Sequence, residues 1–197
     1  MLKKLALLSA TAVSSFALHY AEININDKDL EIGAKFDLGQ FNANVEPDTL
    51  FLGGKFLNAD QKHTDPSVDV DPFYELNFLL LKPVGNMGMK FGMGVKLNYT
   101  SVNNKNYSSM PLGIEFQYKI PAENLIPMYL YGSLYYAPEV LSFSDADNYL
   151  EYRIAYDIEV IENGKFTLGY RHIETNYSEN SDLTYNESFY VGFKIGF

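Results

Sequence analysis

Apolar and polar residues alternate along most of the chain. In Leu30–Leu38 every second residue is apolar, and Glu31, Gly33, Lys35 and Asp37 stand between them. This repeat of two residues is typical of a β-strand with one apolar and one polar face, because successive side chains point to opposite sides.

The same alternation predicts strands along the rest of the chain. It is clear in Met89–Tyr99, Leu112–Ile120, Leu150–Ile158 and Phe189–Phe197. It is weaker in Leu50–Asn58, Phe73–Lys82, Met128–Tyr136 and Phe166–Thr175. After the N-terminal twenty residues no segment repeats with the period of a helix, so the sequence predicts an all-β protein.

The connections between these segments are alternately short and long. The short ones, marked by Pro, Gly or Asn, are Pro83–Gly88, Pro121–Ile126 and Glu162–Gly164. The long polar ones are Ala59–Val70, Ser101–Ser109, Ala137–Asn148 and Asn176–Glu187. Bacterial outer-membrane barrels have short periplasmic turns and long extracellular loops in this order. The connections therefore favour a transmembrane antiparallel up-and-down β-barrel.

The two ends of the chain decide the expected number of strands. The last strand ends at Phe197, where a periplasmic C-terminus is expected. Counting back, Leu30–Gln40 must run inward, so Ala21–Asn26 must first cross outward. We therefore expect about ten strands, an even number as in single-chain bacterial barrels, with both termini periplasmic. Eight strands is the alternative if two of the weaker segments lie outside the barrel.

The N-terminus has the pattern of a secretory signal peptide. Two lysines precede the apolar stretch Leu5–Leu18. This stretch is shorter than the ~18–20 residues that a membrane helix needs, and its length suits a signal peptide. Small residues at the −3 and −1 positions predict cleavage after Ala17, so that residues 1–17 are the signal peptide and residues 18–197 the barrel. Cleavage after Ala21 is the alternative.

Composition excludes several classes of protein. The mean hydropathy of −0.15 argues against a helical membrane protein, whereas the alternating polar residues of a membrane barrel lower this average without preventing insertion. The chain has no cysteine, which excludes disulfides, zinc–thiolate sites and a cysteine nucleophile. A net charge of −10 argues against nucleic acid as a partner. No motif indicates a cofactor.

The last strand and the tyrosines favour lipid outside the barrel, although a water-soluble barrel with an apolar interior would show the same alternation. The chain ends on an aromatic residue after four apolar residues at alternate positions, a pattern that the barrel-assembly machinery reads as its signal. These residues are Phe189, Val191, Phe193, Ile195 and Phe197. Tyrosines near strand ends, on or beside the apolar face, suit the aromatic girdles at membrane interfaces. They are Tyr99, Tyr118, Tyr136, Tyr149 and Tyr170.

If lipid lies outside, the polar face lines the lumen. The basic residues on this face are Lys35, Lys55, Lys90, Lys96, Lys119, Arg153, Lys165, Arg171 and Lys194. The acidic residues are Glu31, Asp37, Glu75, Glu115, Glu151, Asp157 and Glu159. An ion-selective channel is one interpretation, and a plug of paired charges is the other. We favour the plug, because isolated buried ions are costly and the interior of a small barrel is barely wider than its side chains.

The C-terminal third carries a recognisable series of motifs. Tyr129–Asp157 reads YLYGSLYYAPEVLSFSDADNYLEYRIAYD, and Gly169–Thr175 reads GYRHIET. These segments resemble the YfaZ family of outer-membrane proteins. The resemblance lies in an aromatic strand that runs into Tyr-Ala-Pro-Glu, a loop with Ser and Asp, a strand that begins with Tyr, and a later Gly-Tyr-Arg-His strand. The Lys82–Gly85 turn is a weaker match, and the loops here are longer than is usual in that family. The resemblance implies a porin-like outer-membrane barrel without assigned catalytic residues.

Catalysis at the barrel rim would need a His near a Ser or near paired acids. His63 lies in an acidic loop, and His172 lies near a strand end without such partners. We therefore expect no enzyme. The main hypothesis is a porin-like or structural outer-membrane barrel of a Gram-negative bacterium. The alternatives are a surface-loop binding or adhesion protein and a rim enzyme that acts on lipid A or peptides.

The expected partners follow from this location. They are the export pathway, the barrel-assembly machinery, and outer-membrane lipid with lipopolysaccharide. Acidic loops beside an anionic lipopolysaccharide surface would also attract divalent cations. Their carboxylates are Asp60, Asp65, Asp69, Asp71, Glu139, Asp145, Asp147, Glu179, Asp182 and Glu187. Ser142–Asp147 comes nearest to a calcium-binding loop and matches one poorly.

Overall fold

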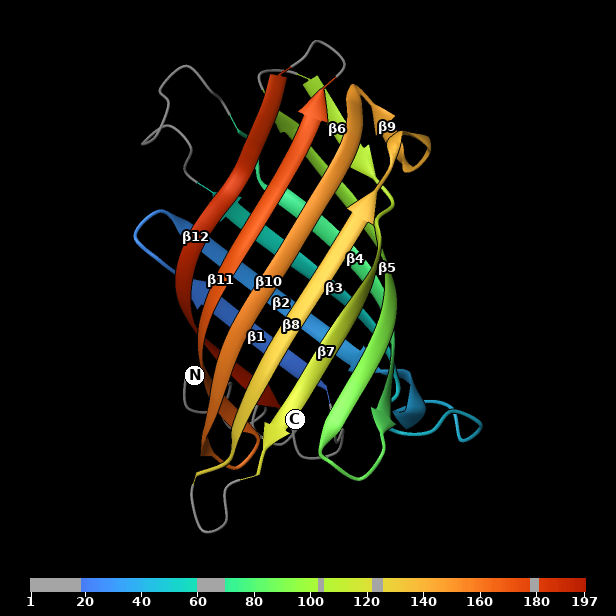
Figure 1. Cartoon of the computed structure of the whole chain (residues 1–197), viewed down its shortest axis with the longest axis vertical. Helices are drawn as coiled ribbons and strands as arrows, with labels where there is room; N and C mark the ends of the chain where they lie inside the picture. The colour runs from blue at the N-terminus through green and yellow to red at the C-terminus, as the bar shows by residue number, and fades with distance from the viewer. Residues whose placement is uncertain (1–18, 60–69, 103–104, 122–125, 178–180) are drawn as a thin grey trace, which may run out of the picture.

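The chain folds into a closed barrel of ten antiparallel strands (Figure 1). The computed structural model describes residues 19–59, 70–102, 105–121, 126–177 and 181–197. The predicted signal peptide, residues 1–17, lies outside them. The described residues contain no helix that is long and apolar enough to cross a membrane.

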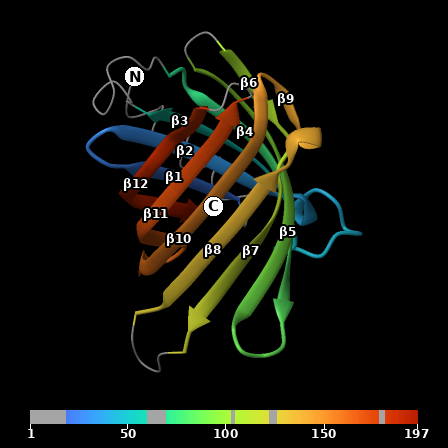
Figure 2. The ribbon, with the colours of Figure 1, turned by 45° about the horizontal axis from the view of Figure 1, so that its top comes forward.

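Each barrel strand hydrogen-bonds to two neighbours, so that the sheet closes on itself (Figure 2). The strands are β1 (Tyr20–Ile25), β2 (Asp29–Asp37), β3 (Leu50–Ala59), β4 (Phe73–Val84), β5 (Met89–Val102), β7 (Leu112–Ile120), β8 (Met128–Ala137), β10 (Ala146–Ile161), β11 (Gly164–Tyr177) and β12 (Ser181–Gly196). The ring closes where β1 pairs with β12, from Tyr20 opposite Gly196 to Ile25 opposite Val191. The predicted all-β, ten-stranded, up-and-down barrel is confirmed, and the eight-stranded alternative is wrong.

The two ends of the barrel differ. At one end, which we call the turn end, lie the starts of β1, β5 and β11, the end of β12 and the short turns 85–88 and 162–163 (Figure 1). The β2–β3 connection, residues 38–49, lies there too and contains the short 3-10 helix η1 (Leu38–Gln40). It is longer than the alternation of short and long connections predicts.

The opposite end, the loop end, carries additional strands. Here β6 (Lys105–Ser109) pairs with β5 and with β9 (Ser142–Ser144), which follows the 3-10 helix η3 (Glu139–Leu141). Strands β11 and β12 also extend past the predicted strand ends, to Tyr177 and from Ser181. Segments predicted as loops therefore form partly polar strands, because two polar strands can pair without showing an apolar face.

Side chains alternate between the inside and the outside of the barrel as predicted. Along β4, Leu76 is 50% exposed while Glu75 is 5% exposed, and along β10, Ile154 is 58% exposed while Arg153 is 4% exposed. The apolar face therefore points outward and the polar face inward. A barrel with an apolar interior, the alternative left open by the alternation, is excluded for the middle of the barrel.

Four of the five predicted girdle tyrosines are at least partly exposed, and one is not. Tyr99 and Tyr136 are about half exposed on the outer face. Tyr149 is fully buried inside, because it lies two residues before Glu151 and so shares its face of β10. It packs in an apolar cluster at the loop end of the interior, which we call the apolar cap. The cap consists of Leu57, Ala59, Phe73, Val102, Tyr107, Ala137, Ala146, Tyr149, Ile173 and Tyr185.

Candidate functional site

The interior below the apolar cap is crossed by a network of paired charges, which we call the charge belt. It consists of Asp29, Glu31, Lys55, Glu75, Lys96, Glu151, Arg153 and Arg171. The belt contains four acids and four bases. Its charges therefore balance within one layer of the barrel.

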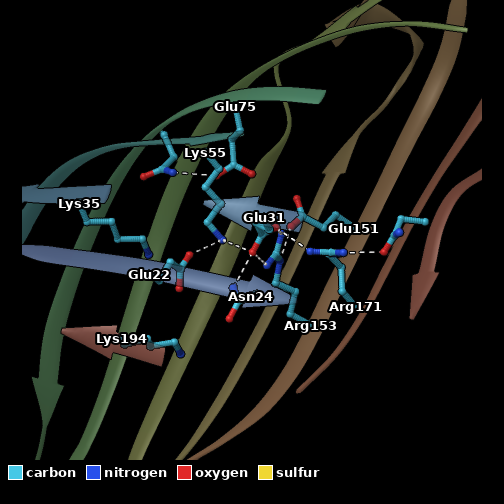
Figure 3. A network of polar contacts seen from close by, with 12 residues as sticks. Glu22, Asn24, Glu31, Lys35, Lys55, Glu75, Glu151, Arg153, Arg171 and Lys194 are labelled. Carbon is cyan, nitrogen blue, oxygen red and sulfur yellow. Dashed lines mark hydrogen bonds and ion pairs between the residues drawn. The ribbon is translucent and has the colours of Figure 1, made fainter. Parts of the chain in front are cut away.

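Glu31 on β2 is the centre of the belt. Arg153 donates from Nη1 to Oε1 at 2.7 Å and from Nη2 to Oε2 at 2.6 Å. Arg171 donates to Oε2 at 2.8 Å, and Asn24 donates to Oε1 at 2.8 Å. Figure 3 shows the two arginines reaching Glu31 from one side and Lys55 from the other, at 3.9 Å. Charge-assisted, bidentate bonds of this kind fix both partners in orientation.

A second acid continues the belt toward the opposite wall. Glu151 accepts from Arg153 Nε at 2.8 Å and from Lys96 Nζ at 2.6 Å. Lys96 also contacts Glu75 on β4 at 2.9 Å. Alternating charges thus run from Glu75 to Arg171 through Glu151, and each buried ion has at least one oppositely charged neighbour. Such pairing offsets the cost of removing the ions from water.

Inward glycines make room for bulky neutral side chains around the belt. A Cβ on Gly94 or on Gly113 would overlap Tyr135. The ring of Tyr135 lies 4.0 Å from Lys96 Nζ, and its hydroxyl donates to Glu115 at 2.8 Å. A Cβ on Gly169 would overlap Tyr190 in the same way. Tyrosine therefore occupies the space that glycine leaves at these positions.

Between the belt and the turn end lies a cavity of about 610 Å³, which we call the vestibule. Four ion pairs line it or its edge: Lys55–Glu22 at 3.1 Å, Lys35–Glu115 at 3.3 Å, Lys194–Asp157 at 3.0 Å, and Lys90–Asp48. Lys55 and Arg153 belong to both the belt and the cavity wall. The charge belt therefore forms the inner end of the vestibule.

Fifteen of the sixteen charges assigned to the lumen are buried inside the barrel or line the vestibule. Buried ones are Glu31, Glu75, Lys96, Glu115, Glu151, Arg153, Asp157 and Arg171. Those on the wall of the vestibule are Lys35, Lys55, Lys90, Lys119, Glu159, Lys165 and Lys194. Asp37, also assigned to the lumen charges, accepts from the backbone N–H groups of Gly39 and Asp48 and so holds the β2–β3 connection in place.

The sequence reasoning missed two acids of the interior. Glu22 contacts Lys55 at 3.1 Å, and Asp29 contacts Arg171 at 3.3 Å. Asp29 has the same parity on β2 as Glu31, so extending the alternation by two residues identifies it. The buried amides of Asn24 and Asn186 donate to Glu31 and Asp29. The same extension of the inward alternation along their strands identifies them.

The histidine considered for catalysis lies on the outer wall. His172 stacks on Tyr152 with ring centroids 4.8 Å apart, and its Nε2 lies 3.2 Å from Glu174. His63 lies outside the described residues. The part of the chain that the structure describes contains no group of three or more His, Asp or Glu side chains placed to hold a metal ion. Of the acidic loop residues, Asp60, Asp65, Asp69 and Glu179 fall outside it.

The family model described as YfaZ precursor matches residues 2–197. The chain belongs to the YfaZ family. A comparison with curated proteins gave no match. In this YfaZ protein the two segments that carry the resemblance form β8, β9, β10 and part of β11. Of these, β8, β10 and β11 are adjacent in the barrel wall. They supply Glu151, Arg153 and Arg171 to the charge belt, so the motifs recognised in the sequence build much of the barrel interior.

Proposed function

We propose that this YfaZ protein is an outer-membrane barrel whose interior is closed to ions, with a structural rather than a channel-forming role. The observation that carries the proposal is the stacking of two barriers inside one barrel. The charge belt fills the middle, and the apolar cap fills the loop end. The proposal includes no catalytic step.

The outer surface supports the membrane location. Large apolar side chains cover it along every described barrel strand from β1 to β12, for example Ile23, Leu52, Leu76, Ile114, Ile154 and Val191. An exposed apolar surface of this extent marks a membrane or protein interface. The closed ring leaves no unpaired sheet edge in the bilayer, and its even number of strands is the rule for bacterial barrels.

The two ends support the orientation. The start of β1 and the end of β12 lie together at the turn end, since Tyr20 pairs with Gly196. We assign this end to the periplasm and the loop end, with β6 and β9, to the cell exterior. Lipopolysaccharide would then surround the loop end, and the export and barrel-assembly machineries would act on the chain before insertion.

The pairing of the termini also supports signal cleavage after Ala17. His19 is 3% exposed and exchanges two backbone hydrogen bonds with Phe197, at 2.8 and 2.9 Å. Cleavage after Ala21 would remove His19 and Tyr20 together with their pairing to β12. N-terminal sequencing of the mature protein distinguishes the two cleavage sites.

Single-channel recording tests the closed interior. Refolded protein inserted into planar bilayers should show no stable conductance steps, because an ion would have to cross both the cap and the belt. Protease protection of the barrel in vesicles shows that the same preparation has inserted. A large, stable and weakly selective conductance of the wild type would contradict the closed interior and favour a porin-like role.

A further inference from the structure

The vestibule differs from the rest of the interior because two of its lysines form no ion pair with another described residue. Lys119 on β7 and Lys165 on β11 both line the cavity near the turn end. Lys35, Lys90 and Lys194 each form an ion pair at the same level. The cavity therefore contains two ammonium groups that are available to bind an anionic ligand.

These two lysines converge on one aromatic ring. Lys165 Nζ lies 3.8 Å from the centroid of the Tyr129 ring, and Lys119 Nζ lies 6.0 Å from it. Glu159 accepts a hydrogen bond from the Tyr129 hydroxyl at 2.8 Å. Asp157 lies directly opposite Tyr129 in the β8–β10 pair and is paired with Lys194. Three lysines and two acids thus lie around Tyr129, which leaves a local excess of positive charge.

The strand register places Lys165 between an acid and a second lysine. It lies directly opposite Glu159 in the β10–β11 pair and directly opposite Lys194 in the β11–β12 pair, and all three side chains line the cavity. Like charges placed directly opposite each other destabilise a sheet. Asp157 neutralises Lys194 through both of its carboxylate oxygens, at 3.1 and 3.0 Å. Glu159 accepts from the Tyr129 hydroxyl, and Lys165 forms no ion pair in the described part of the chain, so an anion entering the vestibule would relieve the repulsion between Lys165 and Lys194.

The opposite wall of the vestibule is apolar. Phe51, Leu79 and Leu81 form a buried cluster, against which Tyr20 packs. All four residues line the same cavity as the two lysines. A volume of about 610 Å³ lies within the range of small-molecule sites, which combine mostly apolar walls with a few charged groups.

We propose that the vestibule binds an amphipathic anion. Lys119 and Lys165 hold its phosphate or carboxylate group beside Tyr129, and its apolar part lies along Phe51, Leu79 and Leu81. The ligand enters from the turn end, because the charge belt closes the other side. A soluble organic anion and the headgroup region of an anionic lipid share this chemistry.

Calorimetric titration with phenyl phosphate tests the proposal on the full mature barrel in phosphatidylcholine nanodiscs. The wild type should bind phenyl phosphate more tightly than inorganic phosphate, and it should not bind phenol. The double variant Lys119→Gln/Lys165→Gln should bind phenyl phosphate at least tenfold more weakly. Lys82→Gln is the matched control, because Lys82 is exposed on the outward face of β4 and does not line the cavity.

Two further variants separate binding from folding. Lys119→Arg/Lys165→Arg keeps both charges and should retain most of the binding. Leu79→Ala should weaken phenyl phosphate and leave inorganic phosphate unchanged. Equal affinity of the wild type and the Gln double variant, or no binding of either phosphate by the wild type, would overturn the proposal.

The lipid composition of the nanodiscs identifies the source of the anion. If phosphatidylglycerol in the disc weakens the binding of phenyl phosphate to the wild type, and leaves the residual binding to the Gln double variant unchanged, the occupant is a lipid headgroup. If it does not compete, the occupant is a soluble anion. Neither result depends on the conductance of the barrel, so this proposal and the closed interior can fail separately.

Discussion

Arg153 and Glu31 face each other across the barrel and are joined by two hydrogen bonds, at 2.7 and 2.6 Å. Their strands, β10 and β2, are separated in the ring by β11, β12 and β1. The side chains are 4% and 1% exposed. The bond therefore ties together parts of the wall that share no backbone hydrogen bond, in a layer where water has little access.

Replacing one member of this pair alone should lower the free energy of unfolding by more than half of what replacing both members lowers it. Arg153→Gln leaves Glu31 with fewer cations in a buried layer, and we expect a loss of about 3 kcal/mol in the free energy of unfolding. Glu31→Gln/Arg153→Gln should lose clearly less than the sum of the two single changes. After the double change Glu151 keeps Lys96, Arg171 keeps Asp29 and Lys55 keeps Glu22.

Urea unfolding in lipid vesicles, followed by circular dichroism, measures this double-mutant cycle. Lys82→Gln, on the outer face, controls for the loss of a charge as such. Additive losses in the double variant would show that the two side chains are not coupled.

Glycine should be required where an inward tyrosine ring packs directly against the backbone of the neighbouring strand. Gly113→Ala puts a Cβ into the space of Tyr135 and close to the Leu134 carbonyl, so we expect a loss of about 1–3 kcal/mol. Gly132→Ala on the next strand is the control, because the nearest atom to its Cβ, the Arg153 carbonyl oxygen, is 3.9 Å away. Comparable urea midpoints for the two variants would contradict the packing of Tyr135.

The strands and the two faces of the barrel could be predicted because both depend on local alternation. Leu76 and Glu75 are adjacent in sequence, and their opposite burial follows from the geometry of any strand. The strand count followed from the parity of the connections. Neither prediction depends on which side chains contact each other across the lumen.

The partners inside the barrel could not be predicted, because they depend on the stagger of the strands around the ring. A pair between Arg153 and Glu151 is expected from their spacing, and it exists at 2.8 Å. The bidentate partner, Glu31, is 122 residues away in the sequence. The apolar cap was missed for a related reason: Phe73 and Tyr149 share the inward parity of Glu75 and Glu151, and the pattern was interpreted as polar along its full length.

A charge on the outer wall should be costly in proportion to its depth in the bilayer. Ile154→Arg, near the middle of β10, should destabilise the barrel by about 2–4 kcal/mol, and Val160→Arg, near the turn end, by about 0–1 kcal/mol. The two native side chains are similarly exposed, at 58% and 53%. Urea unfolding in lipid vesicles gives both values. Equal losses would contradict a bilayer centred on the middle of β10.

The C-terminal aromatic residue should matter more for assembly than for the stability of the folded barrel. Phe197→Asp keeps the two backbone hydrogen bonds to His19 and loses a ring that lies 5.9 Å from the imidazole. We expect outer-membrane levels to fall severalfold in cells, with periplasmic degradation of the remainder. The purified variant should lose about 1 kcal/mol or less. Deletion of Phe197 should lose more, because it also removes the two backbone bonds, each contributing about 0.5–1.5 kcal/mol.

Phe166→Asp separates the assembly signal from the loss of an outward aromatic residue. Phe166 lies on β11 opposite Phe193, near the turn end, and is 38% exposed. It therefore has surroundings similar to those of the C-terminal strand but is not at the chain terminus. If the assembly machinery reads the last strand, Phe166→Asp should reach the outer membrane at near wild-type levels while Phe197→Asp does not. Quantitative blotting of membrane fractions measures both, and an equal fall for the two variants would mean that Phe197 acts only as one more lipid-facing ring.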